Sequence, residues 1–330
     1  MEIVTDLKQF RNQDFPNLVV ALGNFDGVHL GHLRIISTVR ERATKIGGTS
    51  AVFTFKEHPQ RILHRKEDPP ILTSLIHKLI LLEQAGVDLC FLIDFTLALS
   101  KKEPEDFVRE IFMETLGAQE VCLGFNARFG RDRSGDSKLM KRLAEKYQFT
   151  FLEAPQFEVD KQVVSSSTIR SLVREGKLSK SAELLGRPYS VFGTVISGSG
   201  RGKELGFPTA NLELHSEVMP PEGVYAVWVR ILDCRLTETK KGWAQIKEQV
   251  KQERLKGLLN YGRRPTFGIE SKPVAEVHIL NFSEDITNKT VEITIGERLR
   301  AEQAFPSRES LQNQVKHDIE AGQKWFAKQA

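Results

Sequence analysis

Short apolar runs and longer amphipathic stretches alternate along the first half of the chain. The apolar runs have the length of strands and cover residues 18–22, 49–55, 88–95, 120–125 and 149–154. Between them, apolar side chains recur at three- and four-residue spacing in residues 31–45, 74–86, 103–117 and 137–147, which predicts helices. This alternation predicts an α/β domain, in which a parallel sheet is covered by helices on both faces.

The pattern changes near Gly186-Arg187-Pro188, after which strand-like runs dominate. These runs are mostly separated by Gly or Pro and cover residues 189–196, 223–232, 255–262, 273–280 and 290–295. They predict a mainly β domain, a small antiparallel barrel or sandwich. One long helix closes the chain, with Ser307 as its expected cap. We therefore expect two domains, residues 1–185 and 186–330.

One segment, residues 237–256, does not fit a compact barrel. It is rich in charge and has the spacing of a helix, so we expect a solvent-exposed helical excursion. The alternative is a partner-binding site centred on Trp243 and Ile246.

Composition narrows the classes of protein. The 330 residues include 47 basic and 43 acidic side chains, a near-balance that argues against a dedicated nucleic-acid-binding protein. The apolar runs are too short to span a membrane, and the N-terminus has no signal pattern. Cys90, Cys122 and Cys234 are scattered and are expected to be reduced, which favours the cytoplasm. No obligate protein partner is evident, so small-molecule ligands are expected.

The stretch GNFDGVHLGH, Gly23 to His32, follows the first apolar run directly. His29 and His32 are three residues apart with no carboxylate between them, which argues against the zinc-binding HExxH pattern. No Cys/His cluster elsewhere completes a set of metal ligands. At a strand-to-helix turn, backbone N–H groups and the helix dipole attract anions, and imidazoles can donate to phosphoryl oxygens. The stretch therefore predicts a site for ATP phosphates.

A second glycine-rich stretch, GSGRGKELGFPTANL, covers residues 198–212. It is not a P-loop, because Lys203 is followed by Glu204, and its glycine spacing does not match the dinucleotide-binding pattern. Backbone amides at Gly198, Gly200 and Gly202 could wrap a nucleotide phosphate. Thr209 and Asn211 offer neutral oxygens to a hard cation such as Mg²⁺.

The first stretch resembles the HxGH signature of nucleotidylyltransferases, and its longer form resembles their FAD synthetase branch. Residues 55–59 (FKEHP), 123–136 (LGFNARFGRDRSGD) and 164–170 (VSSSTIR) are similar to further segments of that branch. The resemblance implies catalytic roles for His29 and His32. It implies ATP binding by Gly23, Phe25, Gly31, Ser166, Ser167 and Arg170, and flavin binding by Asn126 and Phe129.

The sequence KLSKS at residues 177–181 also resembles a phosphate-binding element of class I aminoacyl-tRNA synthetases. The balanced charge and the barrel-like second half argue against such an enzyme. We expect this segment to join two helices, with Ser179 capping the second.

The second glycine-rich stretch is similar to the signature of riboflavin kinases, in which the counterparts of Thr209 and Asn211 hold Mg²⁺ and ATP phosphate. Residues 260–268 (NYGRRPTFG) resemble a loop of that family, and residues 275–282 (AEVHILNF) resemble the strand with its catalytic glutamate, here Glu276. Residues 299–307 resemble its flavin-contacting segment, which implies that Arg300 and Glu302 bind flavin.

Together the two halves resemble the prokaryotic bifunctional riboflavin kinase/FAD synthetase family. The resemblance implies that riboflavin and ATP give FMN and ADP in the second domain, and that FMN and ATP give FAD and pyrophosphate in the first. Two alternatives stay open: an adenylyltransferase for another phosphorylated acceptor, with a barrel that only binds flavin, and a non-catalytic flavin-binding module.

Overall fold

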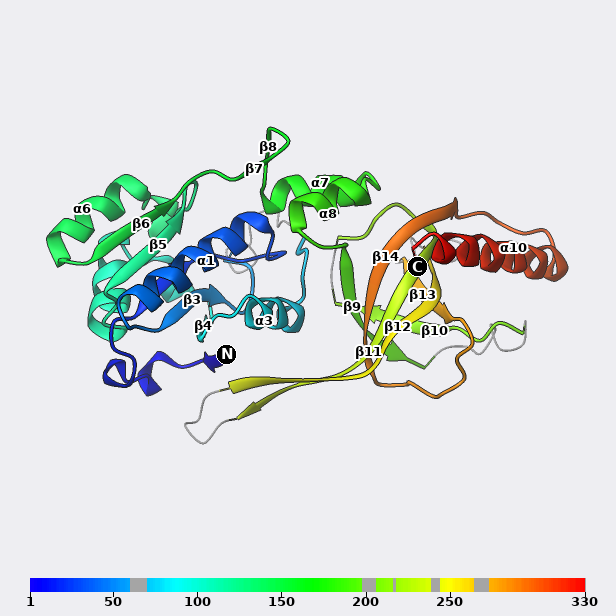
Figure 1. Cartoon of the computed structure of the whole chain (residues 1–330), viewed down its shortest axis with the longest axis horizontal. Helices are drawn as coiled ribbons and strands as arrows, with labels where there is room; N and C mark the ends of the chain where they lie inside the picture. Colours follow the sequence, from blue (N-terminus) through cyan, green and yellow to red (C-terminus); the bar gives the residue numbers. More distant parts are fainter. Residues whose placement is uncertain (60–69, 198–205, 216–217, 239–243, 264–272, 330) are drawn as a thin grey trace. The chain divides into compact units, whose positions relative to one another are not determined.

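A computed structural model describes residues 1–59, 70–197, 206–215, 218–238, 244–263 and 273–329 (Figure 1). Gly198, Gly200, Gly202 and Trp243 lie outside these described residues. The chain divides into two compact units. The first comprises residues 1–71, 75–168 and 235–247, and the second comprises residues 72–74, 169–234 and 248–330.

The first unit is built on a parallel sheet with the strand order β1-β4-β3-β2-β5-β6. The strands are β1 (Glu2–Val4), β2 (Val19–Leu22), β3 (Ser50–Phe55), β4 (Leu89–Ile93), β5 (Glu120–Gly124) and β6 (Thr150–Ala154). The prediction of a parallel sheet is confirmed. The short strand β1 was not predicted, because three residues carry too little periodicity to be recognised.

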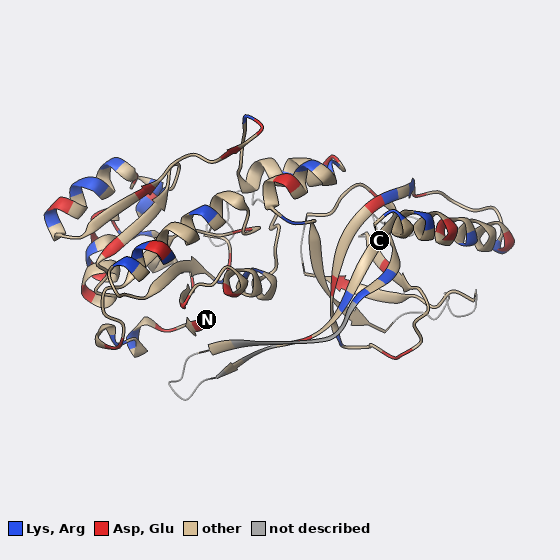
Figure 2. Ribbon diagram, in the orientation of Figure 1, with Lys and Arg blue, Asp and Glu red and all other residues tan. Residues whose placement is uncertain are grey.

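Helices cover both faces of this sheet, because successive strand residues point to opposite sides. On one side α1 (Leu30–Lys45) buries Ile36, Val39 and Ala43. On the other side, alternate strand residues such as Val20 and Phe53 share a core with the helical stretch α5 (Pro104–Phe107), Val108–Thr115 and α6 (Ser137–Tyr147). Figure 2 shows charged residues of both signs along α6, whose apolar face joins this core.

The other described elements of this unit are α3 (Leu75–Gln84), α4 (Leu97–Ser100) and the two-stranded ribbon of β7 (Glu158–Val159) and β8 (Gln162–Val163). Three single-turn 3-10 helices complete them: Leu7–Gln9, Asn12–Asp14 and Arg131–Arg133. Cys90 in β4 and Cys122 in β5 are buried free thiols, as expected.

The expected helical excursion at 237–256 is wrong. The segment is instead a long β-hairpin arm formed by β11 (Gly223–Glu238) and β12 (Ala244–Gly262), which pair with each other. Its tip belongs to the first unit, where Ala244 and Gln245 pair antiparallel with Ile3 and Glu2. Cross-strand hydrogen bonds satisfy the backbone groups that a local helix would have satisfied internally, so tertiary pairing overrides the local helical pattern.

The second unit is a barrel of six described antiparallel strands in the order β11-β14-β9-β10-β13-β12, closed by the pairing of β12 with β11. The other strands are β9 (Ser190–Ile196), β10 (Ala210–Leu214), β13 (Val274–Ile279) and β14 (Thr290–Ala301). The prediction of a β-rich second half with a barrel is confirmed. Closure matters for stability, because it removes the unpaired edges that an open sheet exposes.

Three helices accompany the barrel strands along the chain. The last, α10 (Arg308–Ala327), begins at the expected cap: the Ser307 side chain accepts from the Ser310 N–H at 3.1 Å. The helices α7 (Ser166–Arg174) and α8 (Leu178–Leu185) flank residues 177–181. Ser179 does not cap α8, because the helix already starts at Leu178, and Lys177 occupies the cap position. None of the described helices has the length and hydropathy to cross a membrane.

Candidate functional sites

The loop Gly23–His29 leaves the carboxyl end of β2 at the point where the strand order reverses. From β2 the chain proceeds to β3 and β4 on one side, and it later adds β5 and β6 on the other. Ligands of open parallel sheets bind at such switch points, at the carboxyl ends of the strands. Because Leu22 of β2 pairs with Leu123 of β5, the loops after these two strands leave the sheet side by side. The sequence-predicted ATP and flavin loops therefore lie at one edge.

The two histidines are stacked at the start of α1. Their rings lie 3.6 Å apart with an interplanar angle of 14°. His29 is the N-cap residue, and its Nδ1 accepts from the backbone N–H of His32 at 3.3 Å. A neutral His29 ring therefore carries its proton on Nε2, where it can donate to an anion.

The backbone that leads to these histidines is strained. Phe25 and Val28 have φ angles of 50° and 36°, a left-handed region that costs a non-glycine residue about 1–3 kcal/mol. The Phe25 ring is buried and lies 5.2 Å from the His32 ring. A Cβ at Gly31 would stand 3.2 Å from the His29 ring, so that a larger residue there would push against the ring. Strain of this kind persists only where neighbouring contacts hold it, and it concentrates at functional sites.

The segment 164–170 meets this loop through its first residues. The Ser166 hydroxyl donates to the Asp26 carbonyl at 2.9 Å, which brings the serine-rich motif to the histidine loop. Ser165, which the motif analysis did not single out, caps α7 by accepting from the Thr168 N–H at 3.2 Å. Ser167 lies in the first turn of α7, and Arg170 follows one turn later as a buried side chain.

The loop after β5 contains the predicted flavin residues. Asn126 is exposed, whereas the Phe129 ring is only 5% exposed and packs against Phe107 at 6.2 Å. Phe129 therefore supports this loop from beneath. Phe125, which sequence reasoning missed, is an exposed large apolar side chain beside Asn126. In the sequence Phe125 continues the apolar run of β5, so it could not be distinguished from a buried strand residue.

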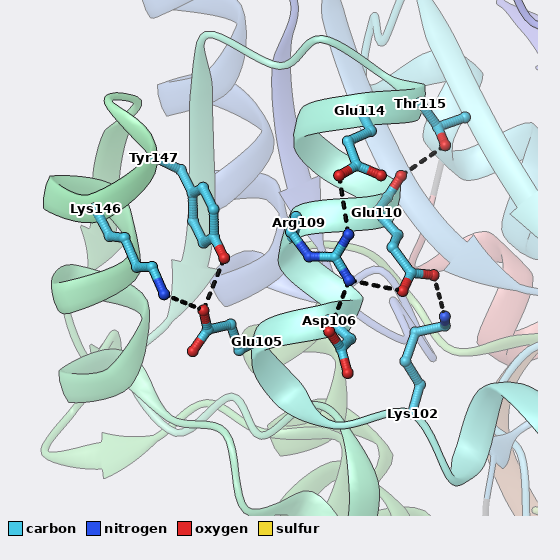
Figure 3. A network of polar contacts seen from close by, with 9 residues as sticks. All are labelled: Lys102, Glu105, Asp106, Arg109, Glu110, Glu114, Thr115, Lys146 and Tyr147. Carbon is cyan, nitrogen blue, oxygen red and sulfur yellow. Dashed lines mark hydrogen bonds and ion pairs between the residues drawn. The ribbon is translucent and has the colours of Figure 1, made fainter.

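A polar network anchors the base of that loop (Figure 3). Arg109 binds the carboxylates of Asp106, Glu110 and Glu114 at 2.8, 3.0 and 2.9 Å, and Lys102 pairs with Glu110. Glu105 accepts from Lys146 and Tyr147 of α6 at 2.6 and 2.7 Å, contacts that hold the pKa of its carboxyl below the usual range. The Lys102 carbonyl accepts from the Arg131 N–H at 2.8 Å, so the network connects directly to the 123–136 loop.

In the barrel, Glu276 lies in the centre of a row of polar residues. It stands directly opposite Asn211 of β10 on one side and Asn260 of β12 on the other. Its strand neighbours Ala275 and Val277 are buried, so the row lies on the face away from the core. Directly opposed residues have Cβ atoms about 4.5–5.5 Å apart, within reach of a shared ligand. Three separate sequence motifs thus meet at one carboxylate.

The two predicted flavin segments of the barrel also converge. The Glu302 carboxylate accepts from the Arg263 backbone N–H and lies against Gly262, where any side chain would overlap it. Burial and the nearby Glu222 carboxylate raise the pKa of Glu302. Arg300, by contrast, is engaged within the protein. Its Nε and Nη2 each donate to Asp318 of α10 at 2.9 Å, and this contact ties α10 to β14.

His278, which sequence reasoning passed over, adds a contact close to the predicted metal ligands. It lies two residues after Glu276 on the same face of β13, and its Nδ1 donates to the Pro208 carbonyl at 2.7 Å. Its ring also meets that of Phe207 edge-on at 6.1 Å. These contacts hold the chain immediately before Thr209.

Comparisons with known proteins find a family match for each half of the chain. Residues 11–168 match the FAD synthetase family, and residues 185–326 match the riboflavin kinase family. The bifunctional riboflavin kinase/FMN adenylyltransferase of Haemophilus influenzae is 31% identical over 96% of each chain. The enzyme of the same name from Bacillus subtilis is 33% identical over 94% of this chain and 92% of its own.

Among solved structures, a Streptococcus pneumoniae protein described as a macrolide-efflux protein is similar over the whole length. It has a TM-score of 0.79 and 26% identity, and the match covers 98% of this chain and 100% of that one. The two family matches occur in the predicted order, and the relatives match end to end. The chain therefore belongs to the bifunctional riboflavin kinase/FMN adenylyltransferase family and catalyses both reactions.

Proposed function

We propose that residues 186–330 form FMN and that residues 1–185 convert it to FAD, with the chemistry carried by the residues described above. The observation that carries this proposal is the row Asn211–Glu276–Asn260, together with the stacked His29 and His32 at the switch point of the other sheet. The row brings together three motifs that are far apart in the sequence, and the Ser166–Asp26 hydrogen bond joins the histidine loop to the distant 164–170 segment.

In the kinase reaction, Glu276 is the general base. The primary hydroxyl of the ribityl chain must lose a proton as it attacks the γ-phosphorus of ATP, and a carboxylate can accept that proton. Thr209 and Asn211 supply neutral oxygens suited to Mg²⁺, and the fit is supported by the carboxylate directly opposite Asn211. When bound, Mg²⁺ would neutralise phosphate charge.

Further residues are assigned to the nucleotide phosphates and to the flavin. Gly198, Gly200 and Gly202 lie outside the described residues, and their assignment to the ATP phosphates rests on the sequence motif alone. Arg300 and Glu302 border the flavin, with Glu302 held in place by the Arg263 N–H and Arg300 by Asp318.

In the adenylyltransferase reaction, His29 and His32 donate to the triphosphate while an FMN phosphate oxygen attacks the α-phosphorus. The new P–O bond forms as the bond to pyrophosphate breaks. Gly23, Phe25 and Gly31 shape the loop so that its backbone approaches the nucleotide. Ser166, Ser167 and Arg170 at the start of α7 contact the phosphates. Asn126 contacts the flavin, and Phe129 holds its loop.

Separate loss of the two activities tests these assignments. Glu276→Gln should abolish FMN formation from riboflavin and MgATP but leave conversion of FMN to FAD intact. The double variant His29→Asn, His32→Asn should show the reverse. Chromatography of flavins after incubation measures both products in one reaction. A folded variant that lost both activities would contradict the two-site assignment.

We further propose that the chain acts in the cytoplasm on ATP, riboflavin and FMN without a protein partner. The buried free thiols of Cys90 and Cys122 and the near-balanced charge support this proposal. The purified chain alone should form FAD from riboflavin. A requirement for an added protein fraction would refute the last point.

A further inference from the structure

Lys78 is a buried lysine beneath the nucleotide loop of the first unit. It lies on α3, and only 8% of the residue is exposed. Its Nζ donates to the Phe55 carbonyl at 2.7 Å and lies 3.4 Å from the Thr54 hydroxyl. Both partners are at the carboxyl end of β3, the strand that pairs with β2 beside the histidine loop. A buried ammonium is costly unless it is paired, so its position calls for an explanation.

The contacts of Lys78 extend into the strained loop. The Thr54 hydroxyl that faces Lys78 donates to the Asn24 carbonyl at 3.2 Å. The Lys78 charge is also attracted by the Asp26 carboxylate, two residues further along that loop. On its other side, Asp26 accepts at its carbonyl from Ser166 at 2.9 Å. The loop is therefore held on both sides of Phe25: the Asn24 carbonyl is tied through Thr54 to Lys78, and the Asp26 carbonyl is held by Ser166.

The charge balance around Lys78 supports an interaction with Asp26. Among the described residues, Cys90 of β4 and Asp26 of the loop are the ionisable groups that act on it. Burial raises the pKa of the Cys90 thiol to about 12, so that this neighbour is neutral at physiological pH. Burial lowers the pKa of Lys78 to about 8. Because this value is still above neutral pH, the side chain stays largely charged there. Of these two groups, Asp26 is the acidic side chain, and its attraction to Lys78 makes it the candidate countercharge.

We propose that Lys78 is a positioning residue for adenylyl transfer, which holds the Asn24–Val28 loop in the strained conformation that presents His29 and His32 to the triphosphate. The inference rests on the proposed role of the two histidines. It adds that the conformation of their loop is maintained from beneath, through Thr54 and Asp26, by a residue that touches no substrate. The proposal gives a reason for the buried Lys78 charge, because an apolar side chain would pack in the core without the cost of burying a charge.

Lys78→Met tests the proposal, because it keeps the length of the side chain and removes the charge. We expect kcat/KM for FAD formation from FMN to fall at least tenfold. FMN formation by the same protein should be unchanged, and it serves as an internal control for folding. Lys45→Met, at an exposed position in the last turn of α1, is the matched control and should change neither activity. Unchanged FAD formation in Lys78→Met would overturn the proposal.

A second variant keeps the test decisive if Lys78→Met does not fold. Asp26→Asn removes the countercharge, and we expect a similar selective loss of FAD formation. If Lys78 acts through Asp26, the double variant should lose no more activity than the worse single one. Losses that multiply would show that the two residues act independently and would overturn the proposal.

The pH dependence of FAD formation distinguishes this positioning role from a purely structural role of Lys78, which would not change that dependence. As pH rises through about 8, Lys78 loses its charge, so FAD formation by the wild type should fall and FMN formation should not follow it. Lys78→Met should lack this fall, and a fall retained in the variant would refute the proposal. The proposed role of His29 and His32 is tested by a different result. It would be refuted if the double histidine variant still formed FAD.

Discussion

The ion pair between Arg300 and Asp318 leads to a prediction that separates a structural role of Arg300 from a flavin-binding role. Asp318→Asn preserves the size of the side chain but removes its charge. In the structure the Asp318 carboxylate accepts from Arg300 through both of its oxygens and from Gln314 at 2.9 Å. The variant therefore leaves a guanidinium facing a neutral amide at the junction of β14 and α10.

The expected cost follows from the burial of the pair. The Asp318 and Arg300 side chains are 6% and 19% exposed. Removing one partner of a buried ion pair costs about 3–5 kcal/mol, and we expect about 3 kcal/mol because the guanidinium can still reach water. Arg300→Met should cost a similar amount. The double variant should cost less than the sum of the two, because neither charge is then left alone.

Urea unfolding followed by tryptophan fluorescence measures this cost. Trp325 on α10 lies 6.5 Å from Trp228 on β11, so undocking of α10 changes the surroundings of two of the three tryptophans. If Arg300 reaches the flavin only when Asp318 holds its side chain in place, both single variants should bind riboflavin more weakly. Quenching of flavin fluorescence measures this affinity. A free energy of unfolding within 0.5 kcal/mol of the wild type in Asp318→Asn, the usual range for a surface substitution, would refute the reasoning.

Three further substitutions test other contacts. Gly31→Ala places a Cβ 3.2 Å from the His29 ring, and steady-state assays should show FAD formation about tenfold slower with FMN formation unchanged. His278→Phe removes the hydrogen bond to the Pro208 carbonyl, worth about 1 kcal/mol, and should raise KM for ATP in the kinase assay; His278→Gln should restore part of it. Arg42→Met leaves the buried Glu120 carboxylate without its bidentate partner, so urea unfolding should show a loss of about 3 kcal/mol. Adding Glu120→Gln should recover much of that loss; stability unchanged by Arg42→Met alone would contradict this account.

Local patterns in the sequence were sufficient to predict most of the helices and strands. Continuous apolar runs predicted β2 and β3, which are buried on both faces, and the three- and four-residue spacing of apolar side chains predicted α1, which is buried on one face. The arm formed by β11 and β12 shows the limit of that reasoning. Its charged residues have helical spacing, yet strand pairing with a distant part of the chain decides the conformation.

Some residues of the candidate sites could be identified from the local sequence, and others only from the folded chain. The motifs identified Glu276, Asn211, His29 and His32 from their local sequence, and the resemblance supplied their expected roles. Lys78 and His278 carry no such local signal, because each acts through a contact with a segment more than 20 residues away. Arg300 was expected to bind flavin, but only the folded chain places Asp318 against it.

The sequence by itself determined the order of the two domains, the type of most helices and strands and the two motifs proposed to bind phosphate, because periodicity and motif spacing are properties of contiguous residues. Only the tertiary structure decided which strands pair, how the barrel closes, that Glu276 stands between Asn211 and Asn260, and that Lys78 contacts Thr54 and Phe55 at the end of β3. These features depend on contacts between residues far apart along the chain. Such contacts form only when burial and hydrogen bonding together outweigh the entropy of closing long loops, and no local pattern records that balance.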